Sequence, residues 1–98
     1  KLAKDVSVIR ALRSLGNSLV AQCADDEAKK ELKKLSDMLN YCDPVSNDAT
    51  VAAETELKDV MEEIQRAMVD NDDTSVVPLC YKAEAILAER NRLCKLNK

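Results

Sequence analysis

The sequence predicts an all-α fold: an antiparallel helical bundle of three long helices with an additional N-terminal helix. Only one glycine and two prolines occur in the 98 residues. Ala, Leu, Glu, Lys and Asp dominate, so intrinsic preference favours helix along almost the whole chain. The aromatic content is two tyrosines. A core of Leu, Val, Ile, Met, Ala and Cys suits a coiled-coil-like helical bundle better than a sheet, which needs aromatic and β-branched surfaces.

The length of the chain corresponds to one domain with a modest core, so we expect residues 1–98 to form a single helical-bundle domain. Because the first residue is Lys1 rather than Met, we expect either a domain excised from a larger protein or a processed chain. No apolar run approaches the roughly 20 residues that a membrane span requires, and no signal peptide is visible. The sequence therefore favours a soluble, cytoplasmic protein.

The first helix is predicted over residues 2–15. Apolar residues recur there at every third or fourth position, the spacing of one helical face: Leu2, Val6, Ile9, Leu12 and Leu15. Gly16 and Asn17 come next. A glycine directly after the last apolar residue is typical of a helix C-cap, so we expect the helix to end there.

The second helix is predicted over residues 18–42, because the apolar spacing continues without losing phase. Its apolar face is Val20, Ala24, Ala28, Leu32, Leu35, Leu39 and Cys42. The alternative is a break at Asp25 and Asp26, which could cap a separate helix. Asp43-Pro44 ends this helix, since a residue before proline is disfavoured in helical angles.

The third and fourth helices are predicted over residues 48–70 and 75–96. The third carries apolar residues at helical spacing, and the cap is expected at Ser46, Asn47 or Asp48. The stretch "DNDDTS" separates the two helices, and Thr74 or Ser75 is expected to cap the fourth. Pro78 would then lie in the first turn, where proline is tolerated.

The composition excludes several kinds of chemistry. The chain contains no histidine, which removes the commonest general acid or base and the commonest metal ligand. With one glycine, a glycine-rich phosphate loop cannot be built. The acidic stretches beginning at Asp43 and Asp70 do not follow the ligand order of a calcium-binding loop. We therefore expect no cofactor and no metal site.

Two weaker chemical interpretations remain. Glu56, Asp59 and Glu63 lie one helical turn apart and could hold Mg²⁺ for nucleotide hydrolysis, although their predicted face is solvated. The four cysteines lack the paired spacing of a zinc module, so we expect small core residues rather than a disulfide or a redox site: Cys23, Cys42, Cys80 and Cys94.

Two surfaces are candidates for binding a partner. The first is the amphipathic N-terminal segment, which could pack on a protein partner, on a second copy as a homodimer, or on its own chain as the fourth helix: Leu2, Val6, Val8, Ile9, Leu12 and Leu15, with Ala11 widening the stripe. The second is a basic end that could meet an anionic polymer or membrane surface: Lys1, Lys4, Lys95 and Lys98.

From the sequence we expect a non-catalytic protein–protein interaction or assembly domain. Binding of an anionic polymer or membrane surface through the basic terminal segments is the alternative, and Mg²⁺-dependent nucleotide hydrolysis is third. Nucleic acid is a poor fit as a partner, because the net charge is −3 and no aromatic stacking platform is present.

Overall fold

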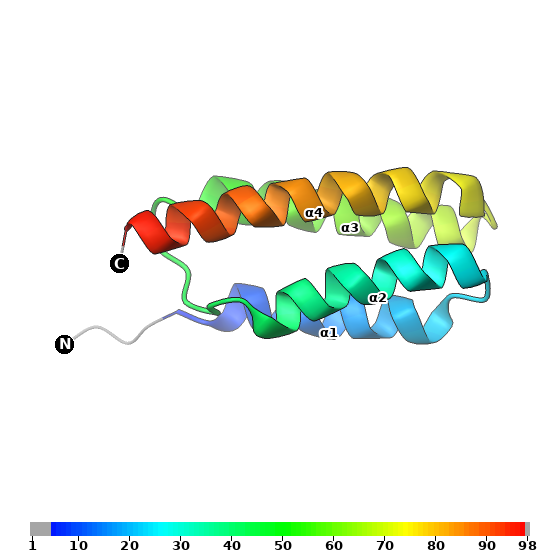
Figure 1. Ribbon diagram of the computed structural model, residues 1–98, viewed down its shortest axis with the longest axis horizontal. Coiled ribbons are helices and arrows are strands. Elements are labelled where there is room, and N and C mark those ends of the chain that lie inside the picture. Colours follow the sequence, from blue (N-terminus) through cyan, green and yellow to red (C-terminus); the bar gives the residue numbers. More distant parts are fainter. Residues whose placement is uncertain (1–4, 98) are drawn as a thin grey trace.

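The computed structural model describes residues 5–97, which form four helices. They are α1 (Ser7–Gln22), α2 (Asp26–Tyr41), α3 (Val51–Val69) and α4 (Asp73–Leu96). The helices run side by side along a body of 46 × 19 × 19 Å (Figure 1). The prediction of an all-α helical bundle is confirmed.

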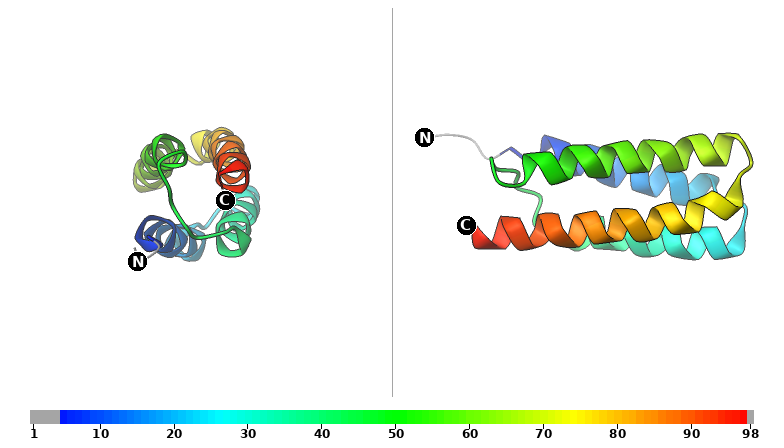
Figure 2. Two further views of the ribbon diagram at one scale, coloured as in Figure 1. Left: turned by 90° about the vertical axis from the view of Figure 1, so that its left-hand side faces the viewer. Right: turned by 90° about the horizontal axis from the view of Figure 1, so that it is seen from above.

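The helices occupy the corners of a square in which consecutive helices are not always neighbours. α1 pairs antiparallel with α2, and α3 pairs antiparallel with α4 (Figure 1). The connection between α2 and α3 crosses the end of the bundle diagonally, as the left view of Figure 2 shows. As a result α2 packs against α4 and α1 against α3, each in parallel, whereas α2 and α3 lie diagonally opposite (Figure 2). The contact between α1 and α3 is the least extensive of the four.

The predicted boundary between the first two helices is wrong. α1 continues through Gly16 and Asn17 as far as Gln22, and α2 begins only at Asp26. The alternative break at Asp25 is the one that forms, because an Asp25 Oδ2 atom accepts a hydrogen bond of 2.9 Å from the backbone N–H of Ala28. This cap satisfies a free N–H at the start of α2.

Gly16 lies inside α1 rather than at a turn. Its φ is negative, and it is buried where α1 meets α2 and α3. A Cβ atom at this position would lie 3.5 Å from Leu39 Cδ1 and 3.6 Å from Met61 Cε. These are ordinary van der Waals distances, so the glycine is not needed to avoid a clash.

The starts of the last two helices also differ from the prediction. α3 begins at Val51, because the Thr50 hydroxyl closes a turn by accepting from the N–H of Asn47 and donating to its carbonyl, both at 3.0 Å. α4 begins at Asp73, which places Pro78 in the second turn rather than the first. Thr74 and Ser75 do not cap this helix. Their hydroxyls instead donate to the Asp72 carboxylate at 2.8 and 2.7 Å.

The core is a continuous apolar column along the bundle axis, and all four helices contribute to it. Its fully buried large apolar side chains are Ile9, Leu19, Leu32, Leu35, Leu39, Leu57, Met61, Ile64 and Leu87. Burial of residues at helical spacing follows the pattern read from the sequence.

A buried ion pair at one end of the bundle joins α3, α4 and the diagonal connection. Arg90 Nε donates to Glu54 Oε2 at 2.8 Å, and the two side chains are 0% and 2% exposed. The guanidinium also donates to the carbonyls of Asp43 at 2.6 Å and Val45 at 3.0 Å. Ser46 Oγ donates to the same Glu54 oxygen at 3.0 Å. Arg90 thus neutralises Glu54 and satisfies carbonyls that the crossing chain would otherwise bury without donors.

A second arginine holds the beginning of the same connection. Arg13 of α1 donates from Nε to the Leu39 carbonyl at 2.7 Å and from Nη2 to the Cys42 carbonyl at 2.9 Å. Leu39 lies in the last turn of α2 and Cys42 is the C-cap residue, and carbonyls at a helix end lack helical partners. The end of α2 is therefore tied to α1, and the following residues are tied to α4.

We predict that Arg90→Met destabilises the protein by about 3–5 kcal/mol, because Glu54 would remain buried without its cation. Urea denaturation followed by circular dichroism measures the change. The control is Arg92→Met, since Arg92 pairs with Glu89 on the surface, with side chains 58% and 51% exposed, and such pairs contribute little. Equal losses of unfolding free energy in Arg90→Met and Arg92→Met would contradict the central role of Arg90.

We also predict that Gly16→Ala stabilises the protein by about 0.5–1 kcal/mol, because alanine restricts the unfolded chain and favours helix. The new methyl group would make contacts at the distances given above. The same denaturation experiment measures the gain, with the exposed Ser18→Ala as a control for helix preference alone. A loss of stability would mean that α1 and α2 cannot accept the added methyl group.

Candidate functional site

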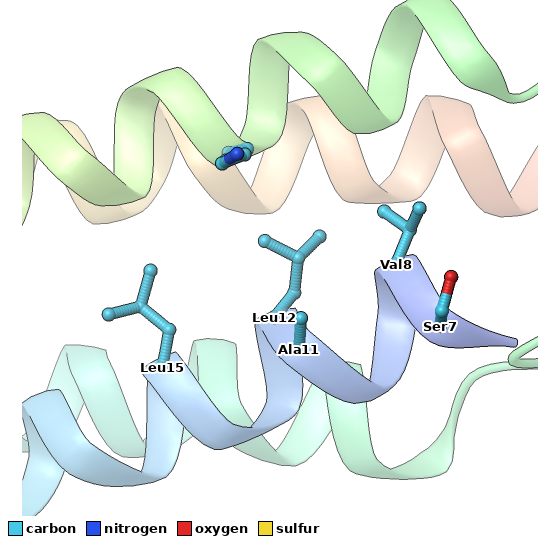
Figure 3. Close-up of a pocket in the computed structure, with 6 residues that line it drawn as sticks. Ser7, Val8, Ala11, Leu12 and Leu15 are labelled. Atoms are coloured by element: carbon cyan, nitrogen blue, oxygen red, sulfur yellow. The ribbon is translucent and has the colours of Figure 1, made fainter.

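A groove lies between α1 and α3, where the bundle has its least extensive helix contact. Its volume is about 330 Å³. Six residues line it, five from α1 and one from α3: Ser7, Val8, Ala11, Leu12, Leu15 and Lys58 (Figure 3). The lining is mostly apolar, which is typical of surfaces that take up an apolar side chain.

The groove follows from the side chains that α1 directs toward α3. Figure 3 shows Val8, Leu12 and Leu15 pointing from α1 toward the neighbouring helix. Leu12 is only 3% exposed and belongs to the core, whereas Val8 and Leu15 are half-buried. Ala11 is too small to fill the space beside them. The edge of the core is therefore open to solvent along this part of α1.

The predicted partner-binding residues divide between core and groove. Ile9 and Leu12 are buried against the same chain, so the N-terminal segment packs as the fourth helix of its own bundle. Val8 and Leu15 line the groove, and Val6 is half-buried just before α1. Leu2 lies outside the described residues. Sequence reasoning missed Lys58, because nothing in the spacing of α3 shows which helix lies next to it.

The groove lies on a helix without acidic side chains. Between Ser7 and Gln22 the charged residues are Arg10 and Arg13, and Arg13 is used to hold the end of α2. Lys58 adds a positive charge to the lining from the α3 side. The charge that lines the groove and the charges of α1 are therefore positive, whereas the rest of α3 is mostly acidic: Glu54, Glu56, Asp59, Glu62 and Glu63.

The predicted basic end is described only in part. Lys95 is exposed near the end of α4, which lies at the same end of the bundle as the start of α1 (Figure 1). Lys1, Lys4 and Lys98 lie outside the described residues. Binding of an anionic surface at this end remains a prediction.

The carboxylates considered for magnesium lie on α3. Glu56 and Asp59 are exposed and Glu63 is half-buried. Within residues 5–97, no three side chains of the Cys, Asp or Glu type are arranged to hold a metal ion. Of the acids before α4, Asp72 accepts hydrogen bonds from the hydroxyl groups of Thr74 and Ser75. Nucleotide hydrolysis remains an untested prediction.

The four cysteines are free thiols, and three of them are buried. Burial raises the pKa of Cys23 and Cys42, and it raises that of Cys80 to about 12. Near Cys42 the guanidinium groups of Arg90 and Arg13 partly oppose this effect. A raised pKa keeps the thiol protonated and weakly nucleophilic near neutral pH.

Comparisons of the chain with protein families, with curated proteins and with solved structures found no match. In the part of the chain that the structure describes, no helix combines the length and the hydropathy that crossing a bilayer requires.

We predict that Cys42 is the first cysteine to react with iodoacetamide, because it is the only half-exposed thiol of the four. Its raised pKa makes the reaction slow at pH 7 and faster toward alkaline pH. Mass spectrometry of the labelled protein measures the rate at each site. Cys42→Ser should remove the fast phase. Equal labelling of all four thiols in the folded protein would contradict the burial described here.

Proposed function

We propose that this protein is a non-catalytic interaction domain whose groove between α1 and α3 binds an amphipathic helix of another protein. The observation that supports it is the open apolar edge of the core at Val8, Ala11 and Leu15. An amphipathic helix in an apolar groove is a common mode of peptide recognition.

The shape of the surface favours another protein over a second copy of this chain. The groove is concave, and its occupant must present a row of projecting apolar side chains. The exposed large apolar residues of the described chain do not form such a row, because they are spread over three helices: Tyr41, Val51, Val69, Tyr81 and Leu96. Two grooves placed face to face would leave both unfilled.

The charges favour an acidic flank on the partner helix. Lys58 lines the groove, and α1 carries arginines without any acidic side chain. Complementary charges steer association and fix the orientation of a bound segment. We therefore expect the partner to carry Asp or Glu beside its apolar row.

The thiols fit a reducing compartment, such as the cytoplasm. Disulfides are rare there, and this chain holds four free cysteines, three of them in the core. A cytoplasmic location is therefore part of the proposal.

The test uses two synthetic 16-residue amphipathic peptides with the same leucine row, one flanked by glutamates and one by lysines. We predict that the acidic peptide binds and that Ala11→Glu weakens binding at least about 10-fold, or about 1.4 kcal/mol. The reason is that a glutamate would fill the groove and repel the acidic flank. Fluorescence anisotropy measures affinity, and amide chemical shifts locate the contact.

The matched control is Ala21→Glu, which places the same charge on an exposed part of α1 outside the groove. It should bind like the wild type. Equal binding of both peptides, or binding unaffected by Ala11→Glu, would contradict the proposal. Light-scattering mass against concentration tests the homodimer: an oligomer that Ala11→Glu dissociates would make a second copy the occupant.

A further inference from the structure

Two carboxyl groups face each other in the interface between α2 and α4, far from the groove. Glu31 belongs to α2 and Glu84 to α4, and Glu84 Oε1 lies 3.9 Å from Nζ of Lys34, which is one turn along α2 from Glu31. Glu31 Oε1 and Glu84 Oε2 are both buried, and neither is hydrogen-bonded to a residue that the structure describes. The Glu84 side chain is 14% exposed.

Two ionised carboxylates cannot satisfy one another, because each is only an acceptor of hydrogen bonds. A proton on either one changes this, since a protonated carboxyl group donates to its neighbour. Burial raises the pKa of Glu84; Lys34 partly opposes this effect, and the nearby Glu31 carboxylate adds to it. Burial disfavours the ionised form of a carboxyl group because water no longer solvates the charge. A second carboxylate nearby disfavours it too, because like charges repel.

The other charged and titratable groups around the pair do not replace this proton. Lys34 of α2 lies 3.9 Å from Glu84 Oε1, but its side chain is 63% exposed, so solvent weakens the attraction. From α4 the Cys80 thiol faces the pair, with a pKa of about 12 caused first by burial and then by these carboxylates. Cys23, at the end of α1, lies near Cys80. Both thiols have raised pKa values and stay neutral near pH 7.

We propose that Glu31 and Glu84 share one proton across the α2–α4 interface, so that acid strengthens the packing of these two helices. The folded protein then holds this proton to a higher pH than the unfolded chain does. The stabilisation is complete below the ordinary glutamate value of 4.5. It is lost as the pH rises through the higher folded value, because the two carboxylates then repel. The interface thereby responds to pH independently of any partner in the groove.

The first test follows the side-chain carboxyl carbons of the wild-type protein by NMR between pH 3 and 9. We expect Glu84 to titrate above the range of an ordinary glutamate, and the carboxyl carbon of Glu31 to respond in the same step, as a shared proton requires. Two independent steps near the ordinary value would overturn the proposal. This experiment needs no substitution and does not depend on the folding of a variant.

The second test compares folding equilibrium constants of Glu84→Gln and the wild type in urea. Glutamine has nearly the same shape and donates to Glu31 at every pH. We divide the folding equilibrium constant of Glu84→Gln by that of the wild type. This ratio should be near 1 at pH 4 and at least about 3 at pH 8. The control, Glu56→Gln on the exposed face of α3, should show a ratio that changes little with pH.

Two results of the second test would overturn the proposal. One is a Glu84→Gln ratio that stays constant between pH 4 and 8, since the pair would then hold no shared proton. The other is a larger stabilisation of the wild type than of Glu84→Gln by added Mg²⁺ or Ca²⁺ at pH 8. That result would show that the two carboxylates take up a cation in place of the proton.

Discussion

The ion pair between Arg90 and Glu54 is the contact on which the arrangement of this bundle depends. The chain between α2 and α3 crosses the end of the bundle, where its carbonyl groups are shielded from water and need donors. Arg90 provides donors to the carbonyls of Asp43 and Val45 while its charge is balanced by Glu54. A guanidinium suits this task because its donors are arranged in a rigid plane. Removing one partner of such a buried pair is costly, because the other partner is left as an unpaired buried charge.

The diagonal crossing decides which helices become neighbours. It places α1 beside α3 and α2 beside α4, in two parallel pairs that no loop joins directly. The α1–α3 pair is the less extensive of the two, and small side chains such as Ala11 leave its outer edge unfilled. The groove proposed as a binding surface is thus a consequence of the same connection that Arg90 holds. The α2–α4 pair is better packed, and it brings together the carboxyl groups of Glu31 and Glu84.

The sequence was most informative where local chemistry acts alone. Apolar spacing identified helical segments and most of their buried faces, and Asp43-Pro44 correctly marked the end of a helix. It failed at Gly16, because a glycine after an apolar residue is typical of a helix cap, whereas here α1 continues through it to Gln22. It failed again at Asp25, because the apolar phase of α1 happens to continue into α2. Val8 and Leu15, predicted as partner-binding residues, line the groove, whereas the contribution of Lys58 was not predicted, because it comes from a distant part of the chain.

By itself the sequence determined that this protein is a helical bundle, which side chains turn inward, and that histidine-based and glycine-loop chemistry is absent from it. These properties depend on composition and on spacing within single helices. Only the tertiary structure decided that α1 lies beside α3, that Arg90 meets Glu54 across 36 positions of the chain, and that Glu31 meets Glu84. The reason is that apolar stripes of similar width can pair in several orders. The choice among those orders is made by polar contacts that few residues carry and that no local pattern reveals.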